Sequence, residues 1–208
     1  HTERMFRYFG VDIQEQGLTL TLNGNRVLRS MSEAPIIIPS DISSAVFVMA
    51  LALMSPNSIC QFPHIGINPS RIAILDVLKD MGASLTIQPH TDAMEPTADI
   101  TVTTSSLQTV SISKSIIPNI IDEIPILSVI ALSGSGRFSI RDAAELRVKE
   151  SDRITGIVQL FQAMGVAISE YEDGFEFDAG QPVQPFDYDA LGDHRLAMSA
   201  IVAASAFG

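Results

Sequence analysis

The chain has 208 residues, of which 46% are hydrophobic and 18% charged, and its formal net charge at pH 7 is −11. This composition allows one large domain or two small ones with a substantial core, and it excludes a largely disordered chain. The acidic charge excludes nucleic acid as a natural ligand, because a protein that neutralises phosphates needs a basic face.

The first segment of the chain predicts a short helix and a hairpin. The helix carries Arg4 and ends at Gly10. Residues 18–22 (LTLTL) predict a strand, and Arg26 to Leu28 predict a second one. The pair Asn23-Gly24 between them is typical of a tight hairpin turn.

Two helical units then alternate along the chain. One unit begins with an arginine and ends at a glycine, which adopts the left-handed conformation of a helix C-terminus without a steric penalty. Its three copies end at Gly10, Gly82 and Gly165. In the other unit an acid precedes an apolar helix. Its three copies begin at Asp41, Asp122 and Asp193.

Short β-rich segments separate these helices. They are residues 58–62, 84–88, 99–103, 110–113, 137–140, 166–169 and 174–178. The helices that follow an acid are apolar nearly all round, so we expect them to be buried on every side, whereas the arginine helices have a polar face. The sequence therefore predicts an inside-out α/β fold, with buried helices inside and sheets outside.

The segment at residues 35–39 predicts a link between two domains. We assign residues 1–37 to the end of a first domain and residues 38–208 to a second one. The chain begins at His1, inside a predicted helix, and stops at Gly208 directly after an apolar helix. We therefore expect a fragment that lacks most of the first domain and the final segment of the second.

Cys60 is the only cysteine, which excludes an internal disulfide and favours a reducing compartment. Its strand-like surroundings favour a buried thiol over a nucleophile. No apolar run reaches membrane-spanning length, and no signal-peptide pattern is present. We therefore expect a cytoplasmic protein without membrane contact.

Residues 147–153 (RVKESDR) place three cations and two carboxylates in seven positions. A solvated surface is the ordinary explanation of such a run. Here, however, the run lies between a strand-like segment and a helix that Ser151 and Asp152 can cap. Charges of both signs at such a turn favour an anionic ligand whose chemistry also needs proton transfer.

This run, extended to Ile154, resembles the signature of the 5-enolpyruvylshikimate-3-phosphate synthase family. Five further segments are similar to family segments and follow in family order. They are residues 1–5 (HTERM), 39–45 (PSDISSA), 68–71 (NPSR), 117–125 (IPNIIDEIP) and 192–198 (GDHRLAM). The resemblance implies two domains, each of three βαβαββ units, which agrees with the repeat.

The resemblance also implies an activity. The family transfers the enolpyruvyl group of phosphoenolpyruvate to the 5-hydroxyl of shikimate 3-phosphate and releases phosphate, in the shikimate pathway to chorismate and the aromatic amino acids. A base takes the hydroxyl proton, an acid protonates the methylene carbon, and no metal or organic cofactor is implied. Much of the family's shikimate 3-phosphate site belongs to the missing N-terminal domain, so we expect this fragment to be inactive alone.

Two acids are implied as catalytic. Asp122 resembles the aspartate that holds the substrate hydroxyls and can accept the 5-hydroxyl proton, although its position also suits an ordinary helix N-cap. By resemblance, Glu150 takes part in proton transfer at the methylene carbon. A surface pair with Lys149, worth at most about 1 kcal/mol, is the ordinary alternative for Glu150.

The cations are implied as substrate-binding. By resemblance, Lys149 contacts shikimate 3-phosphate, Arg153 and Arg195 clamp phosphoenolpyruvate, and His194 contacts its phosphate indirectly. A polar helix cap is the ordinary alternative for His194. A guanidinium suits this task because it donates two parallel hydrogen bonds to a carboxylate or phosphate. The alternative is that each arginine pairs with its neighbouring acid, Asp152 or Asp193. Arg4 and Arg71 share the repeat position of Arg153 but lie outside the signature run, and they are predicted to be structural. His64 and His90 match no motif and are predicted to be surface loop residues.

Two rival hypotheses remain at this point. UDP-N-acetylglucosamine enolpyruvyl transferase shares the fold and chemistry, but the run at residues 147–153 and the Ile121-to-Pro125 segment disfavour it. A non-catalytic βαβαββ module is the third hypothesis. Apolar surface left by the missing segments could also favour self-association of the fragment.

Overall fold

The computed structural model describes residues 1–22, 24, 27–29, 36–90 and 94–208. In chain order the elements are α1 (Thr2–Tyr8), β1 (Ile13–Gln16), β2 (Thr19–Leu22), α2 (Ile42–Met54), β3 (Ile59–Gly66), α3 (Ala73–Asp80), β4 (Ser84–Pro89), β5 (Thr97–Thr103), α4 (Ile117–Ile120), α5 (Ile124–Leu132), β6 (Arg137–Ile140), the 3-10 helix η1 (Ala144–Val148), α6 (Arg153–Ala163), β7 (Ile168–Tyr171), β8 (Gly174–Asp178) and α7 (His194–Phe207).

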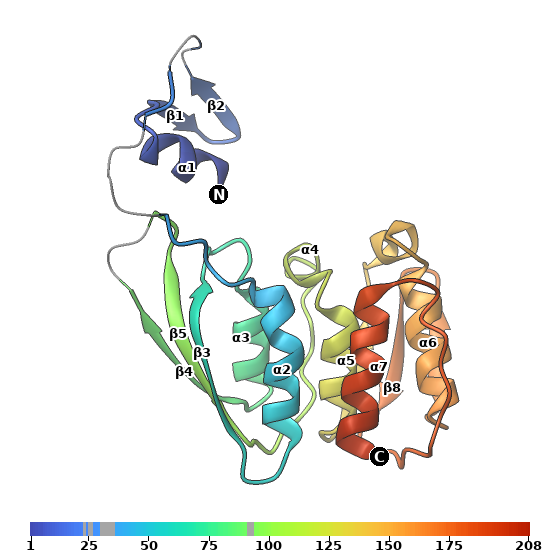
Figure 1. Cartoon of the computed structure of the whole chain (residues 1–208). Helices are drawn as coiled ribbons and strands as arrows, with labels where there is room; N and C mark the ends of the chain where they lie inside the picture. Colours follow the sequence, from blue (N-terminus) through green and yellow to red (C-terminus); the bar gives the residue numbers. More distant parts are fainter. Residues whose placement is uncertain (23, 25–26, 30–35, 91–93) are drawn as a thin grey trace.

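The three helices that follow an acid form the centre of the larger part of the molecule. Helices α2, α5 and α7 contact one another and lie between the antiparallel sheets β3-β5-β4 and β6-β8-β7 (Figure 1). All nine residues of α5 are buried, because its sequence IPILSVIAL is apolar on every side. The predicted inside-out α/β arrangement is confirmed.

The burial prediction is wrong for part of α2 and α7. Each leaves a strip of its surface exposed, including Val48 on α2 and Ile201 on α7. The arginine helices α3 and α6 expose their polar faces as predicted, while their apolar faces join the core. Gly10, Gly82 and Gly165 have positive φ just after α1, α3 and α6, which confirms their predicted role at helix C-termini.

The sequence located most strands, but one predicted strand does not form and one strand has another partner than predicted. Residues 110–113 form no strand, although Val110 and Ile112 pack against the core; β-rich composition stabilises a strand only where a neighbour offers a ladder. Strand β2 matches the prediction at residues 18–22, but its observed partner is β1, and residues 27 and 28 lie in no strand. Asn23 and Arg26 of that predicted hairpin lie outside the described residues.

The small unit α1-β1-β2 stands apart from the helices and sheets of the rest (Figure 1). None of the α1 residues is buried. Cys60 lies on β3 as expected, but it is partly and not fully buried. Among the described residues, no helix is both long and apolar enough to cross a bilayer.

Candidate active site

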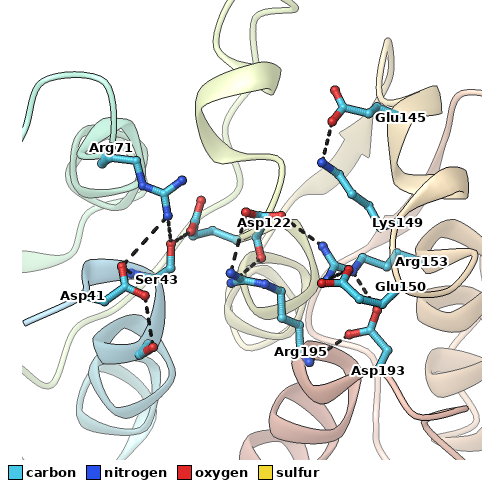
Figure 2. Close-up of polar contacts among 12 residues, drawn as sticks. Asp41, Ser43, Arg71, Asp122, Glu145, Lys149, Glu150, Arg153, Asp193 and Arg195 are labelled. Atoms are coloured by element: carbon cyan, nitrogen blue, oxygen red, sulfur yellow. Dashed lines mark hydrogen bonds and ion pairs between the residues drawn. The ribbon is translucent and has the colours of Figure 1, made fainter. Parts of the chain in front are cut away.

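The predicted site residues come together at one end of the central helices. Asp122 lies just before α5, Arg153 is the first residue of α6, and Arg195 is the second residue of α7. Figure 2 shows their side chains pointing toward one another from these three elements. Residues that are 31 and 73 positions apart in the chain are thereby joined by hydrogen bonds.

Arg153 is the centre of this cluster, and its side chain is 0% exposed. Its Nε donates to Asp193 Oδ2 at 2.8 Å, its Nη1 donates to Asp122 Oδ1 at 3.1 Å, and its Nη2 donates to Glu150. Burial acts to lower the pKa of Arg153, but the hydrogen bond and charge of Asp193, together with Glu150 and Asp122, raise the pKa above its usual value. A buried cation of this kind requires its carboxylates, because an unpaired charge in the interior is strongly unfavourable.

Asp193 has two structural tasks that the sequence predicted only in part. Its Oδ1 caps α7 by accepting from the backbone N–H of Arg195 at 2.9 Å, which confirms the predicted helix start. Its Oδ2 accepts from Arg153 and from the hydroxyl of Ser151 at 3.1 Å. Burial acts to raise the pKa of Asp193, but the hydrogen bond and charge of Arg153 hold it below its usual value.

The predicted local pairings are replaced by longer-range ones. Asp152 caps α6 through Thr155 and pairs with Arg147 at 2.7 Å, while Arg153 turns to Asp193. The carboxylate of Asp193 likewise serves Arg153, so it is not the partner of the Arg195 guanidinium. Ser151 was expected to help cap α6, but its hydroxyl donates to Asp193 instead.

Asp122 is not the helix cap that its position suggested. Helix α5 begins at Ile124, and no side chain caps it. Asp122 is therefore free to face both arginines: Arg153 at 3.1 Å, and Arg195 through an ion pair at 3.6 Å. Arg195 also donates to the Asp122 backbone carbonyl at 3.1 Å. The carboxylate is 27% exposed, so it remains accessible to a ligand.

Glu150 and Lys149 do not form the surface pair considered for them. Glu150 pairs with Arg153 and is 52% exposed, whereas Lys149 pairs with Glu145 (Figure 2). His194 is exposed in the first turn of α7 and has no hydrogen bond or ion pair with any residue that the structure describes. The structure thus joins Asp122, Glu150, Arg153 and Arg195 in one cluster of ion pairs, of which Lys149 and His194 are not members.

A second polar cluster extends this row to α2. Arg71 donates to the Ser43 hydroxyl at 2.7 Å and lies 4.0 Å from Asp41, the residue that caps α2. Ser43 in turn donates to the buried carboxylate of Glu123. Burial raises the pKa of Glu123 despite the opposing effects of Ser43 and Arg71. Arg71 thus lies near the acid that caps a central helix, as Arg153 does, but both side chains of this pair are exposed.

Sequence reasoning missed Ser43 and Glu123. Both lie inside segments that resemble the family, so the signal was present, but neither is set apart there by residue type. Arg71 was predicted to be structural, and its contacts with Asp41 and Ser43 fit that interpretation. Arg4 lies elsewhere, 4.0 Å from Glu95.

Comparison with known proteins identifies the family. The EPSP synthase family (3-phosphoshikimate 1-carboxyvinyltransferase) matches residues 1–207. A 3-phosphoshikimate 1-carboxyvinyltransferase from Acaryochloris marina is 44% identical over 207 residues, which are 98% of this chain and 46% of that protein. The chain belongs to the EPSP synthase family. A relative of the same name from Geobacter metallireducens is 40% identical over 98% of this chain and 47% of its own length.

Solved structures agree with this assignment. EPSP synthase from Acinetobacter baumannii has a TM-score of 0.90 and 35% identity, and the match covers 100% of this chain and 48% of that one. The enolpyruvyl transferase NikO from Streptomyces tendae has a TM-score of 0.61 at 18% identity, over 96% of this chain and 44% of that one, which shows a shared fold alone. The chain thus spans about half the length of its EPSP synthase relatives.

Proposed function

We propose that this chain contributes half of the site at which an EPSP synthase transfers the enolpyruvyl group of phosphoenolpyruvate to the 5-hydroxyl of shikimate 3-phosphate. The observation that carries the proposal is the convergence of Arg153, Arg195, Asp122 and Glu150 at the start of three helices. Family membership favours this function over a UDP-N-acetylglucosamine enolpyruvyl transferase and over a non-catalytic module. We assign residues 1–37 to the end of the first domain and residues 38–208 to the second.

Each side chain has a proposed role that suits its surroundings. Arg195 is partly exposed, and the phosphoenolpyruvate carboxylate or phosphate can compete with Asp122 for its fork of donors. Arg153 can reach the same ligand once Glu150, its most exposed partner, moves away. His194 adds a contact to the phosphate, and Lys149 exchanges Glu145 for shikimate 3-phosphate.

Proton transfer belongs to the two acids in this scheme. Asp122, which pairs with both arginines in the free chain, accepts the proton of the 5-hydroxyl. Glu150 transfers a proton at the methylene carbon when ligand binding separates it from Arg153. Acid–base assistance of this kind contributes roughly 10²- to 10⁴-fold.

Titration with phosphoenolpyruvate by calorimetry tests the binding half of this proposal. Arg195→Gln should abolish binding, because it removes the more accessible guanidinium. Arg137→Gln is the matched control, since Arg137 is also an arginine in an ion pair, with Glu176 on the sheet β6-β8-β7. Equal affinity of all three proteins, or equal loss in both variants, would contradict the proposal.

A phosphate-release assay tests whether this chain is active alone. We expect no phosphate release above background from this chain with both substrates, since the chain spans about half of its relatives and a site closed by two domains supplies the effective molarity. Substantial turnover would refute that expectation.

Sedimentation at several concentrations tests whether the exposed strips with Val48 and Ile201 cause self-association.

A further inference from the structure

Three side chains of metal-ligand type gather on the outer face of the sheet β3-β5-β4. Asp99 lies on the central strand β5, where Ala98 and Ile100 are buried, so the alternation of the strand turns Asp99 outward. His64 comes from the neighbouring strand β3, at the irregularity between Phe62 and Ile65. His90 directly follows β4 on the other side of β5. Both histidines were predicted to lie in surface loops; this is wrong for His64, which lies within β3, whereas His90 follows the end of β4 and lies in no strand.

The spacing of the three side chains suits a single ion. One ligand atom from each residue lies within 4.8 Å of the other two. His90 Nε2 is 3.2 Å and His64 Nδ1 is 3.8 Å from Asp99 Oδ1. Zinc bonds of about 2.0–2.1 Å in a tetrahedron place neighbouring ligand atoms roughly 3.3 Å apart. Small rotations of the exposed His64 and the partly buried His90 imidazoles therefore bring all three to bonding distance.

Hydrogen bonds already hold two of the three ligands in place. The backbone N–H of His64 donates to Asp99 Oδ1 at 3.0 Å, and the residue has a φ of 54°, a conformation that few non-glycine residues adopt. His90 Nδ1 lies 3.0 Å from the hydroxyl of Thr97, which leaves Nε2 directed at Asp99. A ring nitrogen fixed by a hydrogen bond while the other faces the ion is the usual arrangement of a metal-binding histidine.

We propose that His64, His90 and Asp99 bind one divalent transition-metal ion, with Zn²⁺ as the probe. Two imidazole nitrogens and one carboxylate oxygen suit zinc, copper or nickel, whereas calcium and magnesium require mostly oxygen ligands. The ion ties the two outer strands β3 and β4 to the central strand β5. The site uses none of the residues assigned to enolpyruvyl transfer, so the test of metal binding does not depend on that function.

Calorimetric titration of the chain with Zn²⁺ tests the proposal. We expect one ion per chain and a loss of affinity of at least about tenfold in each of His64→Gln, His90→Gln and Asp99→Asn, because losing a ligand costs at least as much as losing a residue that orients one. Asp99→Asn is the most informative variant, since its amide oxygen can still accept from the His64 backbone. His1→Gln is the matched control: His1 is another exposed histidine beside a carboxylate, 3.1 Å from Glu95, and its loss should leave the affinity unchanged.

A spectroscopic measurement on the unsubstituted chain is independent of how the variants fold. Co²⁺ should produce the intense visible absorption of a four-coordinate site, and Zn²⁺ should displace it. No saturable Zn²⁺ binding, no such Co²⁺ spectrum, or binding that survives the His64→Gln/His90→Gln double variant would overturn the proposal. Loss of the site in His1→Gln would overturn it too, because the ion would then sit at the N-terminus.

Discussion

Asp193→Asn separates the two tasks of the most buried carboxylate in the site. The amide oxygen of asparagine can still cap α7, because Asn caps helices about as well as Asp. What the substitution removes is the negative charge 2.8 Å from Arg153 Nε, between two side chains that are both fully buried. Arg153 then keeps only Asp122 and Glu150, which are partly exposed.

The expected loss of stability follows from this geometry. Removing one partner of a buried ion pair costs about 3–5 kcal/mol, and the two remaining carboxylates place this variant at the lower end, at about 3 kcal/mol. Asp152→Asn is the matched control. Asp152 also caps a helix and pairs with an arginine, but 39% of its side chain is exposed, so its loss should cost less than about 1 kcal/mol.

Urea unfolding of the three proteins measures both effects. The midpoint should fall strongly for Asp193→Asn and slightly for Asp152→Asn, with unchanged slopes. Equal losses of unfolding free energy in the two variants would refute the reasoning, because burial would then not strengthen the dependence of Arg153 on Asp193.

The pH dependence supplies a second check on the same residue. Because Arg153 holds the folded-state pKa of Asp193 below its usual value of about 3.9, the stability that Asp193 contributes is present above that pH and is lost as pH falls through the lower, folded pKa. The difference between the wild type and Asp193→Asn should therefore shrink in acid. A difference that stays constant down to about pH 3 would contradict this assignment.

Two further substitutions test the packing and charges around the site. Glu123→Gln should stay within about 1 kcal/mol of the wild type at neutral pH, since it keeps an acceptor for Ser43 and removes a buried charge. Burial raises the folded pKa of Glu123, so the wild type should gain stability relative to this variant as pH falls through that pKa toward about 4.3; a relative loss in urea unfolding would contradict the cause. Gly156→Ala should destabilise α6 by about 1–3 kcal/mol, although alanine normally favours a helix, because its Cβ would lie 2.4 Å from Leu196 Cδ1. Thermal unfolding, compared with that of the exposed control Gln159→Ala, checks this. A stabilised Gly156→Ala protein would show that the Leu196 side chain moves to accommodate the added methyl group.

The sequence was sufficient for the central layer of the fold because its signals are local. An acid before an apolar run fixes where α2 and α7 begin, and glycine fixes where the arginine helices end. Strand pairing is a different matter. Residues 110–113 have strand-like composition but form no strand, because strand formation depends on a neighbouring strand that distant parts of the chain must supply. The same limit explains why the pairing of β2 with β1 was not predicted.

The four residues that converge in the candidate site, Asp122, Glu150, Arg153 and Arg195, were proposed from motif resemblance, but their partners were not predicted. Arg153 follows Asp152 directly, yet the cap bond to Thr155 turns Asp152 toward the start of its own helix, and Arg153 reaches across to α7 instead. The result is a site that supplies its own counterions. An anion that binds Arg153 competes with its carboxylate partners. The fully buried Asp193 cannot move away without leaving the Arg153 guanidinium as a buried charge with one partner fewer. Glu150 is the partner that can move, so the same displacement that admits the ligand also frees the acid that the proposed chemistry needs.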